Sequence, residues 1–270
     1  PADPLDGSGW VEQELTRVLT PINSRPVDLD GDGDLDILGG SRYESRLLWL
    51  ENLGSDGIQF REHRIEVTGR SVPWQPREMH LTRMNVAFLD VNGDGRLDIL
   101  TQETFSKLVW LEQPEEPAAA WQIHQIGTTF PDHSVGVAVG DLNGDGHLDL
   151  LIGSYSRGPR DQDGPGITRD HPVGRLAWFQ NPGSATGEWL RHDISRRKRG
   201  MYDQLILLDM DGDGDFDFTG TRGNSERFDG VFWLEQIRTP GAVASFQPDR
   251  QQESEELPLP SKGLEPEEWE

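Results

Sequence analysis

The 270-residue chain contains no cysteine, which excludes a disulfide framework and every cysteine-ligated metal site. It also has no apolar run near the ~18 residues that a membrane-spanning helix needs. Basic residues are scarce: 25 Lys and Arg stand against 48 Asp and Glu, which gives a formal charge of −23 at pH 7. The missing apolar run leads us to expect no membrane span. Because so acidic a surface repels phosphate backbones, we also expect no nucleic-acid binding.

The chain does contain a nine-residue pattern rich in Asp and Gly, which occurs four times with starts 62, 51 and 68 residues apart. The copies are DLDGDGDLD (28–36), DVNGDGRLD (90–98), DLNGDGHLD (141–149) and DMDGDGDFD (209–217). A second pattern centred on Trp follows each copy: RLLWLEN (46–52), KLVWLEQ (107–113), RLAWFQN (175–181) and GVFWLEQ (230–236). Such regular self-similarity is typical of a repeat architecture.

A third pattern is an aromatic residue followed five positions later by Ile, and it begins 11 residues after each of the first three Trp. The pairs are Phe60/Ile65, Trp121/Ile126 and Trp189/Ile194. After the fourth Trp the same position is Ala244, whereas Trp10 and Leu15 fit the pattern near the N-terminus. We interpret this as a circular closure, in which an N-terminal strand completes the last unit and covers its edge.

Each unit contains four short stretches rich in β-branched and aromatic residues, bounded by Gly, Pro or Asn, which are strand signals. Four strands per unit make the blade of a β-propeller. The prediction is therefore an all-β propeller over residues 9–237, with four blades, or five as the alternative, closed by the N-terminal strand. Residues 238–270 are rich in Pro, Ser, Gln and Glu, and we expect a disordered acidic tail.

The Asp-rich pattern is suited to a hard cation, because side-chain oxygens at positions 1, 3, 5 and 9 and the carbonyl of position 7 can converge on one ion. An EF-hand would need Glu at position 12, where the four copies have Gly39, Thr101, Ile152 and Gly220. We therefore predict about four Ca²⁺ sites between strands. Their residues are Asp28, Asp30, Asp32, Asp34 and Asp36; Asp90, Asn92, Asp94, Arg96 and Asp98; Asp141, Asn143, Asp145, His147 and Asp149; and Asp209, Asp211, Asp213, Asp215 and Asp217.

Over about residues 9–236 these units resemble the FG-GAP repeats of the VCBS type, which occur in bacterial secreted proteins and, in related form, in integrin α-chain propellers. The resemblance implies a propeller fold, calcium and a secreted or periplasmic location. Two departures stand out: seven blades are usual in that family, and two copies carry Asn92 or Asn143 at the third position. An Asn leaves an oxygen ligand in place.

In such a propeller the cation loops mark one end, and the loops at the opposite end form what we name the basic rim. It comprises residues 20–26, 39–46, 68–85, 101–107, 127–134, 153–175, 195–204 and 220–229. These 91 residues hold 17 of the 25 Lys and Arg and 10 of the 48 acids, a formal balance of +7 against −30 for the remainder. This asymmetry favours an anionic ligand. The predicted binding residues are Arg25, Arg42, Tyr155, Tyr202 and Arg222.

Two kinds of function remain open at the basic rim, besides a protein-interaction module of the integrin type. One is a binding module for an acidic glycan or another anionic ligand. The other is a lyase or dehydratase acting on a uronate or other sugar, with His133, His80 or Tyr202 as candidate catalytic residues. The chain has no G-x-S-x-G motif and no phosphate-cradling loop. His63, His124 and His192 recur at one place in successive units, so we interpret them as repeat structure.

Overall fold

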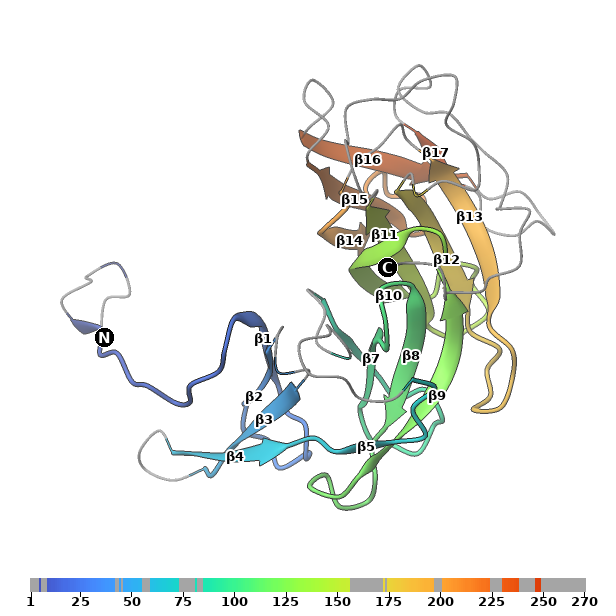
Figure 1. The fold of residues 1–270 in the computed structure, drawn as a ribbon. Helices are drawn as coiled ribbons and strands as arrows, with labels where there is room; N and C mark the ends of the chain where they lie inside the picture. Colours follow the sequence, from blue (N-terminus) through green and yellow to red (C-terminus); the bar gives the residue numbers. More distant parts are fainter. Residues whose placement is uncertain are drawn as a thin grey trace.

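The computed structural model describes most of the chain between residues 9 and 237, and none of its described elements is a helix. The described residues are 5, 9–41, 44, 46–54, 59–72, 81, 85–155, 172, 174–196, 201–223, 230–237 and 246–248. Within them there is no helix long and apolar enough to cross a membrane. The strands form four antiparallel sheets, one of which also has a short parallel edge strand (Figure 1).

Each sheet is built from strands that follow one another along the chain. Blade 1 contains β1 (Pro21–Val27), β2 (Asp36–Ser41), β3 (Arg46–Asn52) and β4 (Phe60–Arg64). Blade 2 contains β6 (Ala87–Leu89), β7 (Asp98–Gln102), β8 (Lys107–Glu112) and β9 (Trp121–Thr128), and the connecting strand β5 (Val67–Thr68) pairs in parallel with β9. This fifth strand has no counterpart in the sequence prediction.

The two C-terminal sheets repeat the same order. Blade 3 contains β10 (His133–Gly140), β11 (Asp149–Tyr155), β12 (Arg175–Gln180) and β13 (Leu190–Arg196). Blade 4 contains β14 (Leu205–Leu208), β15 (Asp217–Arg222), β16 (Gly230–Gln236) and β17 (Phe246–Pro248). The four sheets are arranged in a ring, so the predicted all-β propeller of four blades is confirmed (Figure 1).

Three hydrophobic clusters hold neighbouring blades together. In blades 1 to 3 the third strand carries a Trp into the junction with the next blade, and Trp49, Trp110 and Trp178 are between 1% and 3% exposed. These repeated Trp residues therefore belong to the core. Their counterpart Trp233 is only half-buried, and Val231 beside it is 80% exposed. Among the described residues, no such cluster joins blade 4 to blade 1.

The outer strand of blade 4 corrects the prediction of closure by the N-terminus. Residues 10–19 form no strand, and Trp10 is 63% exposed. Instead β17 pairs with β16, and Phe246 lies opposite Gln236 just as Phe60 lies opposite Asn52 in blade 1. The loop before this aromatic is two residues longer than in the other blades, and a shift of two residues preserves the face of a strand. The predicted propeller boundary at residue 237 is therefore too early, because residues 246–248 pair with β16 as part of blade 4.

Asn85, which precedes β6 of blade 2, forms hydrogen bonds to residues of the other three blades. Its Oδ1 accepts a hydrogen bond from Arg25 Nη2 of blade 1 at 2.9 Å. Its Nδ2 donates to the carbonyl of Val135 in blade 3 at 2.9 Å and to that of Asp203, before β14, at 2.8 Å. With 7% of its surface exposed, Asn85 satisfies polar groups from which most water is excluded.

We expect the Asn85→Ala substitution to lower the free energy of unfolding by about 2 to 3 kcal/mol, because two carbonyls and a guanidinium lose a partner in a buried setting. Urea-induced unfolding measured by Trp fluorescence tests this. Asn85→Asp keeps the acceptor for Arg25 but turns a carboxylate oxygen toward the two carbonyls, which repel it, so it should not recover the lost stability. A loss under about 0.5 kcal/mol for Asn85→Ala would show that water replaces these bonds at little cost.

Candidate functional site

The four Asp-rich copies form the loops that connect the first and second strands of each blade, and all four adopt one conformation. In the first loop, the Asp28 carboxylate accepts the Gly31 N–H at 2.9 Å and the Gly33 N–H at 3.1 Å. The equivalent bonds recur in the other three loops at 2.7 to 3.1 Å. The loop glycines have φ between +76° and +95°, a conformation that side chains disfavour, which explains the fixed Gly positions.

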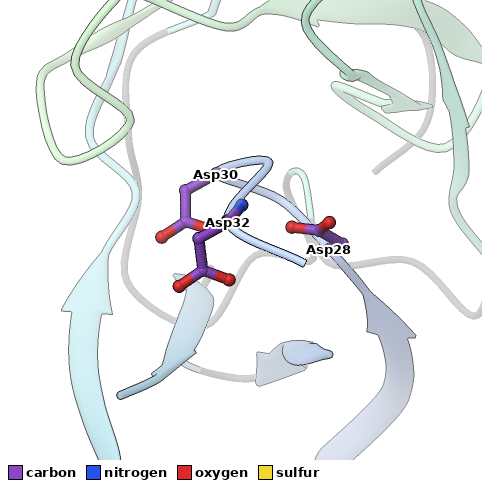
Figure 2. A group of neighbouring side chains, drawn as sticks. All are labelled: Asp28, Asp30 and Asp32. Atoms are coloured by element: carbon purple, nitrogen blue, oxygen red, sulfur yellow. Dashed lines mark hydrogen bonds between the residues drawn. The ribbon is translucent and has the colours of Figure 1, made fainter. Parts of the chain in front are cut away.

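Carboxylates gather most closely in loops 1 and 4. Oxygens of Asp28, Asp30 and Asp32 lie within 4.8 Å of one another, and so do those of Asp209, Asp211 and Asp213. Figure 2 shows the first of these groups around the loop that follows β1. Three like charges at this separation repel one another, and a cation would remove that repulsion. Because every donor is an oxygen, the set fits a hard divalent ion.

Loops 2 and 3 contain fewer charges. In each, the third-position Asn donates from Nδ2 to the fifth-position carboxylate: Asn92 to Asp94 at 3.0 Å and Asn143 to Asp145 at 2.8 Å. In loop 2 the Arg96 guanidinium also pairs with Asp94, and its Nε donates to the Gln113 carbonyl at 3.0 Å. Loop 2 therefore carries a positive side chain of its own. The affinity of such sites for calcium rises with ligand charge, so loops 1 and 4 should bind it more tightly.

The Asp at the ninth position of each loop is buried and accepts hydrogen bonds from two backbone N–H groups that lie far apart in the sequence. Asp98 is fully buried, and its two oxygens accept the Val91 N–H and the Gln113 N–H, each at 2.9 Å. The same pair of bonds recurs at Asp36, Asp149 and Asp217. In blade 1 the indole N–H of Trp49 also donates to Asp36 at 2.8 Å. The sequence prediction treated these residues as ligands alone and missed this structural role.

Burial raises the pKa of Asp98 to about 6 and that of Asp149 to about 7, although two backbone hydrogen bonds to each carboxylate act in the opposite direction. Because folding raises both pKa values above the ordinary Asp value of about 3.9, the folded state holds more protons than the unfolded state between about pH 4 and 7.

We therefore expect the calcium-free protein to become more stable as the pH falls from about 7 to 5, by at most about 1.4 kcal/mol per pH unit for each of these groups. Urea unfolding at several pH values in a chelator measures this. Asp98→Asn and Asp149→Asn should each flatten the profile, and a profile unchanged in both variants would contradict the assignment.

The structure brings together only part of the predicted binding set at the basic rim. Arg25 and Tyr155 are half-buried, whereas Arg222 is 3% exposed. Tyr202 is fully buried in the cluster between blades 3 and 4, with its ring edge-on to Phe232, so it belongs to the core and is not accessible to a ligand. Arg42, His80 and the rim's third histidine, His171, lie outside the described residues.

The third catalytic candidate, His133, is 2% exposed. Its Nδ1 lies 3.1 Å from the hydroxyl oxygen of Tyr155, and its ring contacts Phe105 at a centroid distance of 4.5 Å. Next to it, Asp132 and Arg175 form an ion pair with a distance of 2.6 Å between Oδ2 and Nη1. Nothing in the sequence patterns singled out this pair, and one of the rim's Arg is thus neutralised internally.

Comparison with known proteins identifies the repeats. The model of the FG-GAP-like repeat family matches residues 28–101 and 90–152. Residues 28–152 are thus similar to FG-GAP-like repeats. Each matched stretch begins at the first Asp of a cation loop and ends in β7 or β11, the second strand of the following blade. The FG-GAP-like repeat therefore includes the Asp loop as a defining part, which confirms the resemblance noted from the sequence.

No curated protein matches the chain. One solved structure similar to this chain is that of an Agrocybe aegerita lectin, described under the heading of its specific recognition of non-reducing terminal N-acetylglucosamine. The two are 14% identical with a TM-score of 0.32, over 86% of this chain and 66% of the lectin. The chain thus spans just under two thirds of the length of that lectin.

Proposed function

We propose that this chain is a calcium-stabilised propeller module, secreted or periplasmic, that binds an acidic glycan or another anionic ligand through the basic rim. The observation that carries the proposal is the separation of charge between the two ends of the blades. Each cation loop joins a first strand to a second strand, and the rim loops leave the other ends of those same strands. The acidic and basic loops therefore face opposite ways.

Calcium is the cation that suits the acidic end. The donors are carboxylate, amide and carbonyl oxygens, and the loops contain no Cys and no His at positions where a side chain would ligate. Extracellular modules of this kind bind calcium with dissociation constants of about 0.1 to 1 mM. Such weak sites are filled only where calcium is abundant, which supports a location outside the cytoplasm.

The basic end supports the ligand class. The guanidinium group of Arg can pair with a carboxylate or sulfate group through two hydrogen bonds, and the ring of Tyr can stack on a sugar ring. Arg25, Arg42 and Tyr155 are the rim residues that we assign to this role. The burial of His133 and Tyr202 does not favour the lyase alternative, because a general base must reach the proton that it removes.

A glycan array probed with and without calcium tests the proposal. We expect acidic glycans to be retained at low salt and lost as salt rises, because screening weakens exposed charge pairs. Arg42→Ala should reduce retention, whereas Arg17→Ala, an exposed Arg outside the rim, should not. Failure to retain any anionic polymer at low salt would overturn the glycan proposal and leave a protein-interaction module.

A further inference from the structure

In three blades, a Trp, a His and a Glu or Gln form an equivalent set of neighbouring side chains beside the hydrophobic core. A Trp and the acidic or amide residue two positions later lie on the third strand, and a His lies on the fourth. The members are Trp49, Glu51 and His63 in blade 1; Trp110, Glu112 and His124 in blade 2; and Trp178, Gln180 and His192 in blade 3.

The His and Trp of each set are direct neighbours across two strands, and their rings are stacked. The centroid distances are 4.4, 4.2 and 4.3 Å in blades 1, 2 and 3, with interplanar angles of 22°, 14° and 19°. Because Trp49, Trp110 and Trp178 are buried in the junctions between blades, they fix the plane of each imidazole. The imidazole Nε2 is thereby held at a defined place at the blade surface.

That Nε2 meets the third member of the set. It lies 2.6 Å from Glu51 Oε2 in blade 1 and 2.7 Å from Glu112 Oε2 in blade 2. In blade 3 the distance from His192 Nε2 to Gln180 Oε1 is 3.3 Å. Since an ionised carboxylate can only accept, the imidazole N–H is the donor in blades 1 and 2.

In blade 2 the same Glu also reaches the cation loop of its own blade. Its other oxygen, Glu112 Oε1, accepts a hydrogen bond from Asn92 Nδ2 at 3.2 Å.

We propose that Glu112 is a positioning residue of cation loop 2. An Asn can turn either its oxygen or its nitrogen toward an ion, and only the oxygen is a ligand. Asn92 Nδ2 donates both to Asp94 Oδ2 and to Glu112, and Oδ1 accepts the Asp94 N–H at 3.1 Å, so Glu112 helps to fix the amide in the orientation that leaves a lone pair of Oδ1 for calcium. His124 holds Glu112 in place. This inference rests on the proposed calcium binding.

Blade 4 provides a natural contrast. The chain contains no His after His192, so Trp233 and Glu235 have no stacked imidazole beside them. Trp233 is also only half-buried. Loop 4 must therefore hold its ligands without this support, although its Asp pattern matches that of loop 1. A substitution that disconnects the support in blade 2 should consequently affect loop 2 alone.

The test is a calcium titration of the ¹⁵N-labelled full chain, followed through the loop amides by NMR. The N–H groups of Gly95, Gly146 and Gly214 each bond the first Asp of their own loop and so report loops 2, 3 and 4 separately. With Glu112→Ala, we expect the calcium concentration at half-saturation to rise about tenfold at Gly95, the size typical of losing an outer partner of a metal ligand. The values at Gly146 and Gly214 should not change.

Two further variants separate positioning from packing. His124→Phe keeps a ring on Trp110 but removes Nε2, and it should weaken loop 2 as Glu112→Ala does. Glu112→Gln should retain near-normal affinity, because its amide oxygen can still accept from Asn92 Nδ2. The matched control is Gln125→Ala, which changes an exposed position next to His124 on β9. A Gly95 midpoint unchanged in both Glu112→Ala and His124→Phe would overturn the inference, whereas loop amides that do not respond to calcium at all would overturn the proposed function.

Discussion

Removal of calcium with a chelator is expected to lower the free energy of unfolding of this propeller by about 6 kcal/mol. At a dissociation constant of ~0.1 mM, typical of weak extracellular sites, ~1 mM calcium stabilises the folded state by about 1.4 kcal/mol per site. Four loops together would then supply an amount comparable with the whole stability of many domains, about 5 to 15 kcal/mol. The calcium-free protein should therefore unfold at a much lower temperature and a lower urea concentration than the calcium-loaded protein.

The physical source of this dependence is repulsion within the loops. The oxygens of Asp28, Asp30 and Asp32 lie within 4.8 Å of one another, and no cationic side chain occupies loop 1 or loop 4. Without a cation, each folded loop keeps charges together that the unfolded chain would separate. Calcium binds the folded arrangement and not the dispersed one, so it adds its binding free energy to folding.

Thermal unfolding in calcium and in chelator, at matched ionic strength, measures the effect. Asp32→Asn is the informative variant because the amide oxygen can still accept the Asp34 N–H that Asp32 Oδ1 accepts at 2.9 Å. Removing one charge should make the chelated protein more stable and the gain from calcium smaller. Equal melting temperatures with and without calcium in the parent chain would contradict the prediction.

The local elements of this fold could be predicted from the sequence because they recur. The four Asp–Gly loops, the strands around them and the burial of Trp49, Trp110 and Trp178 all follow from patterns with fixed spacing. Repetition supplies the evidence that a single Asp-rich turn would lack, since chance seldom repeats a spacing four times. The predicted equivalence of His63, His124 and His192 was correct for the same reason.

The closure of the last blade could not be predicted in this way because it departs from the repeat. The fixed interval of 11 residues pointed to Ala244, although Phe246 takes the equivalent place in the register with β16. Loops between strands vary in length at low cost, whereas register is set by pairing. An interval measured along the chain is therefore a weaker guide than the alternation of faces within a strand.

The basic rim shows a second limit of sequence reasoning. Counting Arg and Lys in loops gives a net charge but not which charges face solvent. In the structure Arg175 is neutralised by buried Asp132, Arg222 is itself buried, and Arg46 lies 3.3 Å from Glu44 and 3.4 Å from Glu62. These pairings depend on which loops meet in space. Even the half-buried Arg25 donates to Asn85 Oδ1 at 2.9 Å, so its substitution would disturb the contacts between blades as well as the rim.

The buried ion pair between Asp132 and Arg175 carries the second large prediction. Their side chains are 0% and 1% exposed, and the pair joins the segment before β10 to the start of β12. Asp132 also accepts the Gly174 N–H at 2.9 Å. Removing one partner of a buried pair leaves the other as an uncompensated charge, so we expect Arg175→Met to lower the free energy of unfolding by about 3 to 5 kcal/mol.

A double substitution tests whether the cost comes from the charge left behind. In Arg175→Met/Asp132→Asn the buried carboxylate is gone, but an amide oxygen remains for the Gly174 N–H, so much of the lost stability should return. The matched control is Arg64→Met, which removes the partner of Glu66 at 3.1 Å on the surface, where both side chains are at least half exposed. Such exposed pairs contribute about 0 to 1 kcal/mol. If Arg175→Met cost no more than Arg64→Met, or if the double variant were less stable than the single one, an uncompensated charge would not explain the effect.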